Sequence, residues 1–283
     1  MTVFMGIDLE TTGLDPKTDK IIEVGVSVWK MDTGCKSVPI LSFSNIIDPH
    51  QKIPEAITAL TGLSSYDCER YGVNSLQEAM GPVEALLCMV DYFVAHNAKF
   101  EREFLAHNGY LGLISQRHWI DTKTDIPYPQ GKGDGSLSEI LMNHGIFNPM
   151  PHRALPDAFG MMQLLAKYPV ADVVKISVIP KWTLICRSPY DPSGGVQSFL
   201  KGLGFYWDGS QKRWHKPCRK NKVCEEIDTL LEGSIFMGEL FVETDTETGE
   251  QPATLIYDEL KEEAENAIRS YLAMCQVSSK SPP

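Results

Sequence analysis

The sequence predicts an α/β fold for residues 1–168, joined to a smaller α+β domain. Strand-like segments follow one another closely near the N-terminus, and later strands are followed by a loop and then a helix. A third observation is that the pattern of predicted strands and helices becomes less regular after Tyr168. An aromatic hairpin is predicted further along the chain. Ligands of α/β folds gather where strands end, so polar residues at those ends are candidate functional residues.

Three strands are expected in the first fifty residues, arranged as a meander. The first ends in the polar turn Thr11-Thr12-Gly13. A short helix follows over residues 53–62, because Pro stands near its start and Gly at its end. Residues 75–89 form a second helix, with apolar residues at helical spacing. The three strands cover residues 4–13, 20–29 and 38–46.

The next strand predicted in this domain stops at a polar pair, His96-Asn97, and a helix carrying Phe100 and Phe104 on its inner face follows. Pro156 suits the first position of a last helix, which leaves His152 on the loop before it. The elements expected in this part are strands at 92–95 and 119–122, a Gly- and Pro-rich loop at 127–136, and helices at 137–143 and 156–167.

Residues 169–180 are expected to be a linker, and residues 181–277 a small α+β domain. Asp208-Gly209 is a strong turn signal between aromatic segments, which predicts a hairpin. The tail 278–283 is expected to be disordered. The other elements expected here are strands at 182–187, 235–243 and 254–257, helices at 193–200, 223–231 and 259–274, and an acidic loop at 244–251.

Composition places the chain among ordinary globular proteins, with 283 residues, 43% apolar and 22% charged. It has neither a membrane-length apolar run nor a signal-peptide pattern. Its seven scattered cysteines lack C-x-x-C spacing, so we expect neither a disulfide framework nor a zinc site, and a cytoplasmic location. A net charge of −11 argues against non-specific wrapping of nucleic acid but suits a site that collects metal ions.

Asp8 and Glu10 lie two positions apart on the first strand, so their carboxylates point to the same side. One interpretation is an exposed strand face with solvated charges. The other is a carboxylate pair that binds hard divalent cations such as Mg²⁺. The pair alone does not decide between them.

Three segments together resemble the motifs of the DEDDh exonuclease family. They are D-x-E-T-T-G at the start, H-N-A-x-F-(acid)-x-x-F-L near residue 100 and H-x-x-x-x-D near residue 155. The family includes proofreading subunits of bacterial replicative polymerases, exonuclease X and ribonuclease T. The resemblance covers about residues 1 to 168. It implies a ribonuclease H-like fold, with a mixed central sheet flanked by helices, that removes nucleotides from 3′ ends.

The resemblance also implies roles for individual residues. Asp8, Glu10 and Asp157, with Glu101 as the fourth carboxylate, would hold two Mg²⁺ or Mn²⁺ ions, and His152 would take a proton from the attacking water. Two metals about 4 Å apart can clamp the attacking and leaving oxygens of the reaction. The substrate contacts implied are Thr11 and Thr12 near the terminal sugar and His96, Asn97 and Phe100 behind it.

Glu101 departs from the family pattern, which has Asp at this position. One extra methylene moves the carboxylate by about a bond length, and a misplacement near 1 Å can cost about a hundredfold in rate. Three outcomes are open. The backbone at residue 101 lies further from the metals and compensates for the longer side chain, one metal binds weakly, or the enzyme is slow. Glu103 should point elsewhere, because it lies two helix positions further on.

Residues 201–222 carry seven Lys and Arg against a single acid, Asp208. Aromatic residues lie among these charges, a pattern that holds single strands by stacking and phosphate pairing. The alternative is a small hairpin core with solvated lysines. The basic residues expected to contact nucleic acid are Lys212, Arg213 and Lys216.

These observations predict a metal-dependent 3′→5′ exonuclease acting on DNA, with RNA as an alternative substrate. The rival is a weak or inactive nuclease-fold protein that binds nucleic acid or a protein partner. The C-terminal domain could also dock onto a protein.

Overall fold

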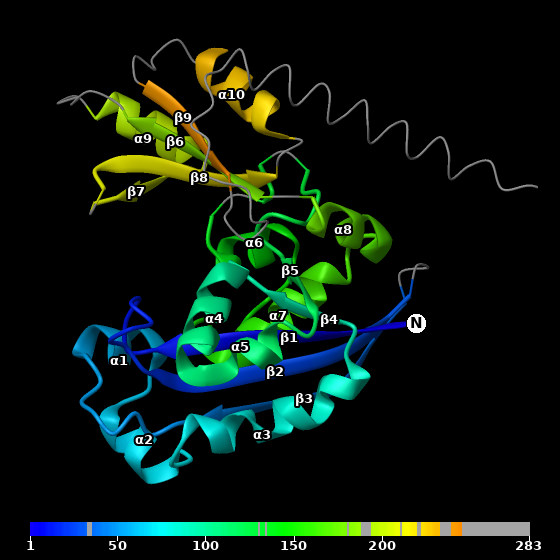
Figure 1. Cartoon of the computed structure of the whole chain (residues 1–283), viewed down its shortest axis with the longest axis vertical. Coiled ribbons are helices and arrows are strands. Elements are labelled where there is room, and N and C mark those ends of the chain that lie inside the picture. The colour runs from blue at the N-terminus through cyan, green and yellow to red at the C-terminus, as the bar shows by residue number, and fades with distance from the viewer. Residues whose placement is uncertain are drawn as a thin grey trace, which may run out of the picture. The chain divides into compact units, whose positions relative to one another are not determined.

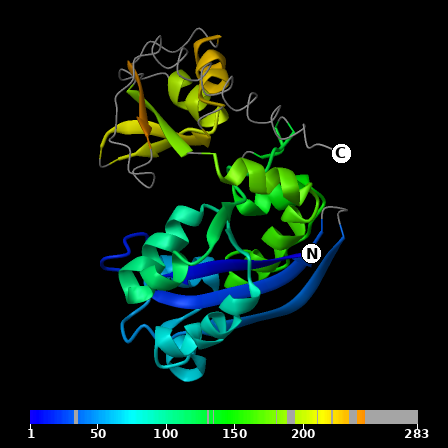
Figure 2. The same cartoon turned by 45° about the vertical axis from the view of Figure 1, so that its right-hand side comes forward.

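The computed structural model describes the chain as two compact units, Met1–Ser177 and Val178–Pro283, each treated by itself below (Figures 1 and 2). Within the described residues, no helix is long and apolar enough to cross a membrane. The described residues are 1–32, 36–129, 131–133, 135–179, 181–187, 194–209, 211–219, 222–232 and 239–244.

The first unit is built on a five-stranded sheet with the order β3-β2-β1-β4-β5. β1, β2 and β3 pair antiparallel, whereas β4 and β5 are parallel to β1. The sheet is therefore mixed, which confirms the expected fold class. The strands are β1 (Thr2–Thr11), β2 (Ile21–Met31), β3 (Ser37–Ile46), β4 (Tyr92–Ala95) and β5 (His118–Asp121).

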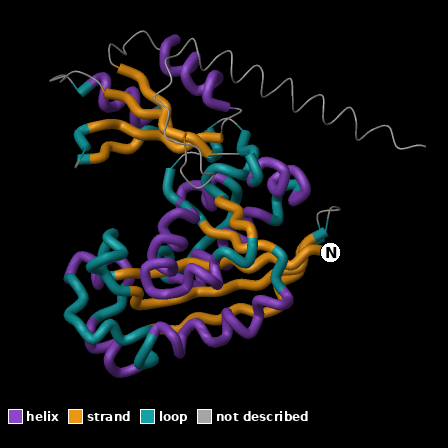
Figure 3. Tube along the Cα trace, in the orientation of Figure 1, coloured by secondary structure: helices purple, strands orange, loops and turns teal. Residues whose placement is uncertain are grey.

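Helices cover both faces of this sheet (Figure 3). The helices of the first unit are α1 (Glu55–Thr61), α2 (Ser65–Tyr71), α3 (Leu76–Leu86), α4 (Ala98–Leu105), α5 (Leu111–Ile114), α6 (Leu137–Asn143), α7 (Ala154–Leu165) and α8 (Val170–Ser177). A 3₁₀ turn, Leu87–Met89, follows α3, and a π-helical segment, Ala106–Tyr110, links α4 to α5.

The alternation of β1 separates two hydrophobic layers. Met5, Ile7 and Leu9 are buried with residues of α3, α4 and α5, whereas Phe4 packs with residues of α6, α7 and α8. Asp8 lies on the same strand face as Phe4, so it is presented toward α7.

Two glycines let α7 pack closely on the sheet. A Cβ on Gly25 of β2 would stand 2.1 Å from the carbonyl carbon of Ala154, and one on Gly6 of β1 would stand 2.7 Å from Met162. Larger residues would push the helix outward. The first turn of α7, which carries Asp157, is thus held against β1 and β2.

Most of the helices and strands predicted for this unit are present, but the structure differs from the predictions at α2, α7 and α8, and the short helix α5 was not predicted either. Helix α2 was not predicted, although Ser64 and Asp67 form a capping box at its start. Helix α7 begins at Ala154, two residues before Pro156, because proline is tolerated anywhere in a first turn whose amides lack helical partners. The expected linker 169–180 instead contains α8, whose Val173 is fully buried in the core of the first unit.

The second unit contains a four-stranded antiparallel sheet with the order β7-β8-β6-β9. Helices α9 and α10 pack against one face of it, around Trp182, Leu184 and Trp214. The predicted hairpin is present as β7 and β8. The elements are β6 (Lys181–Arg187), α9 (Gly195–Gly202), β7 (Tyr206–Asp208), β8 (Arg213–Arg219), α10 (Val223–Glu232) and β9 (Glu239–Thr244). The strand expected at 254–257, the helix at 259–274 and the tail lie outside the described residues.

Candidate active site

A cleft of about 270 Å³ opens where β1 and β4 end and the helices α4 and α7 begin. The packing brings residues from three segments of the chain, 8–11, 96–101 and 152–157, to this place. The predicted site residues that line the cleft are Asp8, Glu10, Thr11, His96, Phe100, Glu101, His152 and Asp157.

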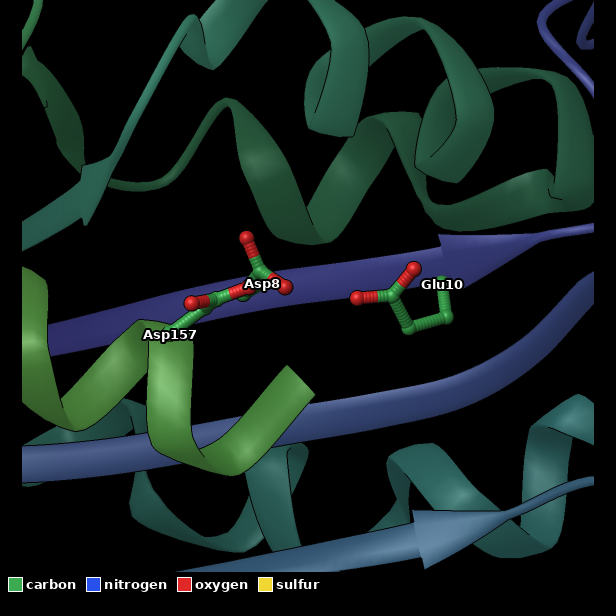
Figure 4. Close-up of side chains that lie close together, drawn as sticks. All are labelled: Asp8, Glu10 and Asp157. Carbon is green, nitrogen blue, oxygen red and sulfur yellow. The ribbon is translucent and has the colours of Figure 1, made fainter. Parts of the chain in front are cut away.

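Three carboxylates form the centre of the cleft. Asp8, Glu10 and Asp157 each present an oxygen within 4.8 Å of the other two. Figure 4 shows Asp8 and Glu10 on β1, with Asp157 reaching them from the first turn of α7. Oxygen donors at this spacing suit a hard divalent cation.

Both oxygens of Asp157 have hydrogen-bond donors from the loop that precedes α7. Asn148 Nδ2 donates to Oδ1 over 2.5 Å, and the backbone amide of His152 donates to Oδ2 over 2.9 Å. These bonds fix the carboxylate in the first turn of a helix, where the helix dipole favours a negative charge. The amide of His152 is thereby held beside the carboxylate of Asp157.

Glu23 lies directly opposite Glu10 in the register of β2 and β1, and it is 1% exposed. Arg153 pairs with it through two hydrogen bonds, from Nε to Oε2 over 2.9 Å and from Nη2 to Oε1 over 3.0 Å. The amide of Ala154 donates to Oε2 over 3.1 Å. Glu23 therefore caps the first turn of α7 from a neighbouring strand.

Burial and crowding raise the pKa values of the acids. For Asp8, burial raises the pKa well above its usual range, and the charges of Glu101, Asp157 and Glu10 add to this. For Glu10, burial and then Asp157 and Glu23 raise the pKa from 4.5 to about 8, while Arg153 opposes them. The pKa of Asp157 is raised by burial, and the amide of His152 lowers it. A cation is the electrostatic partner that this cluster favours.

Glu101 is separate from the three clustered carboxylates but lines the same cleft. It is 3% exposed, and its Oε2 has no hydrogen-bond partner. Burial raises the pKa of its carboxyl group well above the usual range. A buried carboxylate oxygen without a partner is costly, and a metal ion or its water shell would satisfy it. The donor set therefore fits a divalent metal, with Asp8, Glu10 and Asp157 as the ligands and Glu101 beside them.

His96 is held as a neutral ring at the edge of the cleft. Burial lowers its pKa to about 4. Thr122 Oγ1 donates to the carbonyl of Ala95, so its 3.0 Å contact with His96 Nδ1 is a bond that Nδ1–H donates. Nε2 therefore carries a lone pair and can accept a hydrogen bond from a ligand in the cleft.

The family model for exonucleases matches residues 5–165, which contain every residue of this cleft. The chain belongs to the exonuclease family. This match confirms the resemblance that the three sequence motifs indicated.

Curated relatives in this family are much longer than the matched part. The chain is 30% identical over 169 residues to the PolC-type DNA polymerase III of Thermotoga petrophila, covering 58% of this chain and 12% of that one. It is 32% identical over 166 residues to the 3′-5′ exonuclease DinG of Bacillus subtilis, covering 55% of this chain and 16% of that one. The structure of Escherichia coli exonuclease I with a dT13 oligonucleotide shares the fold, at a TM-score of 0.50 and 15% identity, over 71% of this chain and 50% of that chain.

Two of the substrate contacts predicted for the first unit, Thr12 and Asn97, are not among the residues that line the cleft. Thr12 is 4% exposed, and its hydroxyl bonds Asp19 Oδ1 and accepts from the amide of Lys20, so it holds the loop after β1. Asn97 adopts φ +71° as the N-cap residue of α4. Both have a local structural function, and their contact with substrate stays a prediction. Thr11 does line the cleft.

The sequence reasoning missed two groups of residues at this exonuclease site. The first is the apolar wall of the cleft, formed by Leu14, Ile57, Leu60 and Leu137. The second is Glu23, Arg153 and Asn148, which hold α7 and its loop. A single acid within the apolar run around Glu23 was a usable signal, because a charge in a buried strand requires a partner.

Glu103 and the basic residues of the second unit have different surroundings. Glu103 is half-exposed and pairs with Lys99 over 3.7 Å, so it points elsewhere, as predicted. Lys212 is exposed and has φ +51°. Lys216 pairs with Glu226 on α10 over 2.5 Å, so its charge is already neutralised.

Proposed function

We propose that this protein is a metal-dependent 3′→5′ exonuclease that hydrolyses the terminal phosphodiester bond of a DNA strand and releases a nucleoside monophosphate. The observation that carries the proposal is the cleft in which three carboxylates lie within 4.8 Å of one another and His152 is also present. The names of its relatives, a DNA polymerase III and a 3′-5′ exonuclease, favour DNA over RNA.

In the proposed reaction, His152 accepts the proton of the attacking water. The water oxygen bonds to phosphorus, and the bond from phosphorus to the 3′-oxygen of the penultimate nucleotide breaks. That oxygen takes up a proton and becomes the new 3′-hydroxyl. Two divalent ions, when bound, would acidify the water and stabilise negative charge on the phosphate oxygens.

The walls of the cleft suit the terminal nucleotide. Leu14 is 85% exposed and Leu60 is 49% exposed at the rim, and both face solvent where a base could cover them. Phe100 lines the same cleft. Nε2 of His96 offers an acceptor to a hydroxyl or amino group of that nucleotide. Apolar walls with a few polar groups are typical of such binding sites.

Matched 3′-labelled substrates test the proposal: single-stranded DNA, duplex DNA and RNA, each with Mg²⁺ and with Mn²⁺. We expect label to be released as a mononucleotide, and Asp8→Ala or Asp157→Ala to reduce the rate by more than about a hundredfold. Glu103→Ala is the matched control and should leave the rate unchanged. A wild-type protein that leaves every substrate intact with both metals would refute the proposal.

A second candidate is a nuclease-fold protein with little turnover that binds nucleic acid or a protein partner. The position of Glu101, outside the group of three carboxylates, favours it. Here Glu101→Asp should create activity that the wild type lacks. If the wild type already turns over and Glu101→Asp only slows it, this second candidate is excluded.

For the second unit we propose contact with a single nucleic-acid strand. Trp207 is 51% exposed and Tyr206 is 40% exposed on β7, and Lys212 follows in the turn. Stacking on aromatic side chains is worth about 1–3 kcal/mol per base. Trp207→Ala with Lys212→Ala should weaken binding of a labelled oligonucleotide, with Lys175→Ala as control. Unchanged binding would point to a protein-docking unit instead.

A further inference from the structure

The loop that carries His152 is in an unfavourable backbone conformation. His152 has φ +61°, a region that residues with a Cβ rarely adopt. Its amide donates a hydrogen bond to Asp157 Oδ2 in the cleft. The direction of its imidazole therefore depends on whatever holds the next residues in place.

Those next residues are held by Glu23. The carboxylate accepts two hydrogen bonds from the side chain of Arg153 and one from the amide of Ala154. Arg153 is the N-cap residue of α7 but makes no capping bond with its own side chain. Glu23 supplies that cap from β2, which sits beside β1 in the sheet. The buried carboxylate of Glu23 thus connects the loop that carries His152 to β2. This strand pairs with β1, which carries Asp8 and Glu10.

The close approach of α7 to β2 keeps the hydrogen bonds between Glu23 and the start of α7 short and their geometry fixed. Gly25, two residues after Glu23 on the same strand, leaves room for the backbone of Ala154 and Leu155. The two hydrogen bonds from Arg153 use both oxygens of Glu23, which restricts the guanidinium to one orientation. Any shift of α7 relative to β2 must break this pair.

We propose that Glu23 and Arg153 are positioning residues that hold His152 in the geometry for proton transfer. The inference rests on the proposed function for its rate readout, but not for its structural readout. Neither side chain lines the cleft, so neither is assigned a contact with substrate.

Two substitutions test the pair: Arg153→Gln removes the charge and the two-pronged contact, and Glu23→Gln keeps the shape of the side chain. Each should lower kcat by roughly ten- to a hundredfold, the cost of a displacement near 1 Å. KM should change less than about threefold, because lost transition-state contacts appear in kcat. The double variant should be no slower than the slower single variant.

Nuclear magnetic resonance of the imidazole of His152, assigned with His152→Gln, gives a readout that needs no turnover. Arg153→Gln should shift and broaden that signal. Arg117→Gln is the control for general destabilisation, because Arg117 bonds the carbonyls of Val90 and Leu87, and neither these residues nor Arg117 line the cleft. Arg117→Gln should leave both the signal and kcat unaltered.

If Arg153→Gln does not fold, Arg153→Lys can replace it, because it retains the positive charge but lacks the guanidinium group that forms two hydrogen bonds. Its effects on kcat and on the His152 signal should be smaller and in the same direction. A folded Arg153→Gln or Arg153→Lys with an unchanged His152 signal and unchanged kcat would overturn the inference. Inactive wild-type protein would instead overturn the proposed function, while the His152 signal would still decide this one.

Discussion

Crowded carboxyl groups determine the chemistry of individual residues in the cleft. Asp8, Glu10 and Asp157 share a space that burial makes unfavourable for negative charge, and the pKa of each is raised. The site is therefore assembled for binding at the expense of stability, a balance typical of functional sites. Neutralising one acid should relieve repulsion while removing a ligand.

This balance predicts how stability depends on pH in the absence of metal. The pKa of Glu10 is about 8 in the folded chain against an ordinary 4.5, so the folded state retains a proton that the unfolded state loses. The stabilising contribution is complete below about pH 4.5 and is lost as pH rises through about 8.

We expect the melting temperature of EDTA-treated protein to fall between pH 5 and pH 8, and Mn²⁺ to restore it. In Glu10→Gln the fall should be smaller by roughly 2–4 °C, which corresponds to about 1 kcal/mol in a chain of this size. Differential scanning calorimetry measures both. A larger fall in the variant than in the wild type would contradict the assignment of a raised pKa.

His96 titrates in the opposite sense. Because its pKa is lowered to about 4, the folded state stays neutral where the unfolded state, near 6.5, takes up a proton. The wild type should therefore lose stability relative to His96→Gln as pH falls from about 6.5 toward 4. The ring nitrogen signals should show an Nδ1–H tautomer down to pH 5. A ring that titrates near 6.5 would contradict both expectations.

Among the elements, α7 decides whether the site exists. It brings Asp157 to the carboxylates of β1, and Gly25 of β2 provides the space that it needs. No periodicity of apolar residues in the chain reports this approach, because it depends on the absence of a side chain on a neighbouring strand.

Gly25→Ala should therefore destabilise the fold, because its Cβ would lie about 2.1–2.3 Å from the backbone of Ala154 and Leu155. We expect a loss of about 1–3 kcal/mol in urea unfolding, together with weaker Mn²⁺ binding. Gly81→Ala in α3 is the matched control: its Cβ would meet nothing within 4 Å, and it should be neutral or stabilising by about 0.5–1 kcal/mol. Equal losses in the two variants would contradict the proposed packing.

Element prediction succeeded for α1, whose ends carry local signals, and failed for α8, where packing decides. Pro54 and Gly62 flank α1, as the sequence predicted, whereas the caps that Ser75 and Ser136 form at α3 and α6 were not predicted. Residues 169–180, which contain α8, were predicted to be a linker, because their apolar stripe is short. Burial of Val170 and Val173 against the first unit makes it a helix of that unit.

At the scale of the whole molecule, the first unit, Met1–Ser177, contains the entire cleft and its own core layers. A chain ending at Ser177 should therefore fold, bind Mn²⁺ and retain nuclease activity, whereas one ending at Tyr168 should lose α8 and unfold more readily. Circular dichroism, calorimetry and the labelled-strand assay would compare the two. Equal stability of both fragments would show that α8 contributes nothing to the first unit.

The sequence alone was sufficient for the fold class, the family and eight of the residues that line the cleft. Strand alternation placed Asp8 and Glu10 on one face, and the order of three motifs connected them to Glu101, His152 and Asp157. These features are local or follow from order along the chain. Local spacing is enough to predict them.

The tertiary structure alone decided which motif residues face the cleft and which hold it together. Thr12 belongs to a family-like motif, and its hydroxyl holds the loop after β1. Asn97 belongs to another such motif and is the N-cap residue of α4. Glu23 is 130 positions from Arg153, and the pairing exists only because β2 lies beside β1 under α7. Contacts between distant segments depend on packing geometry, which spacing along one chain does not contain.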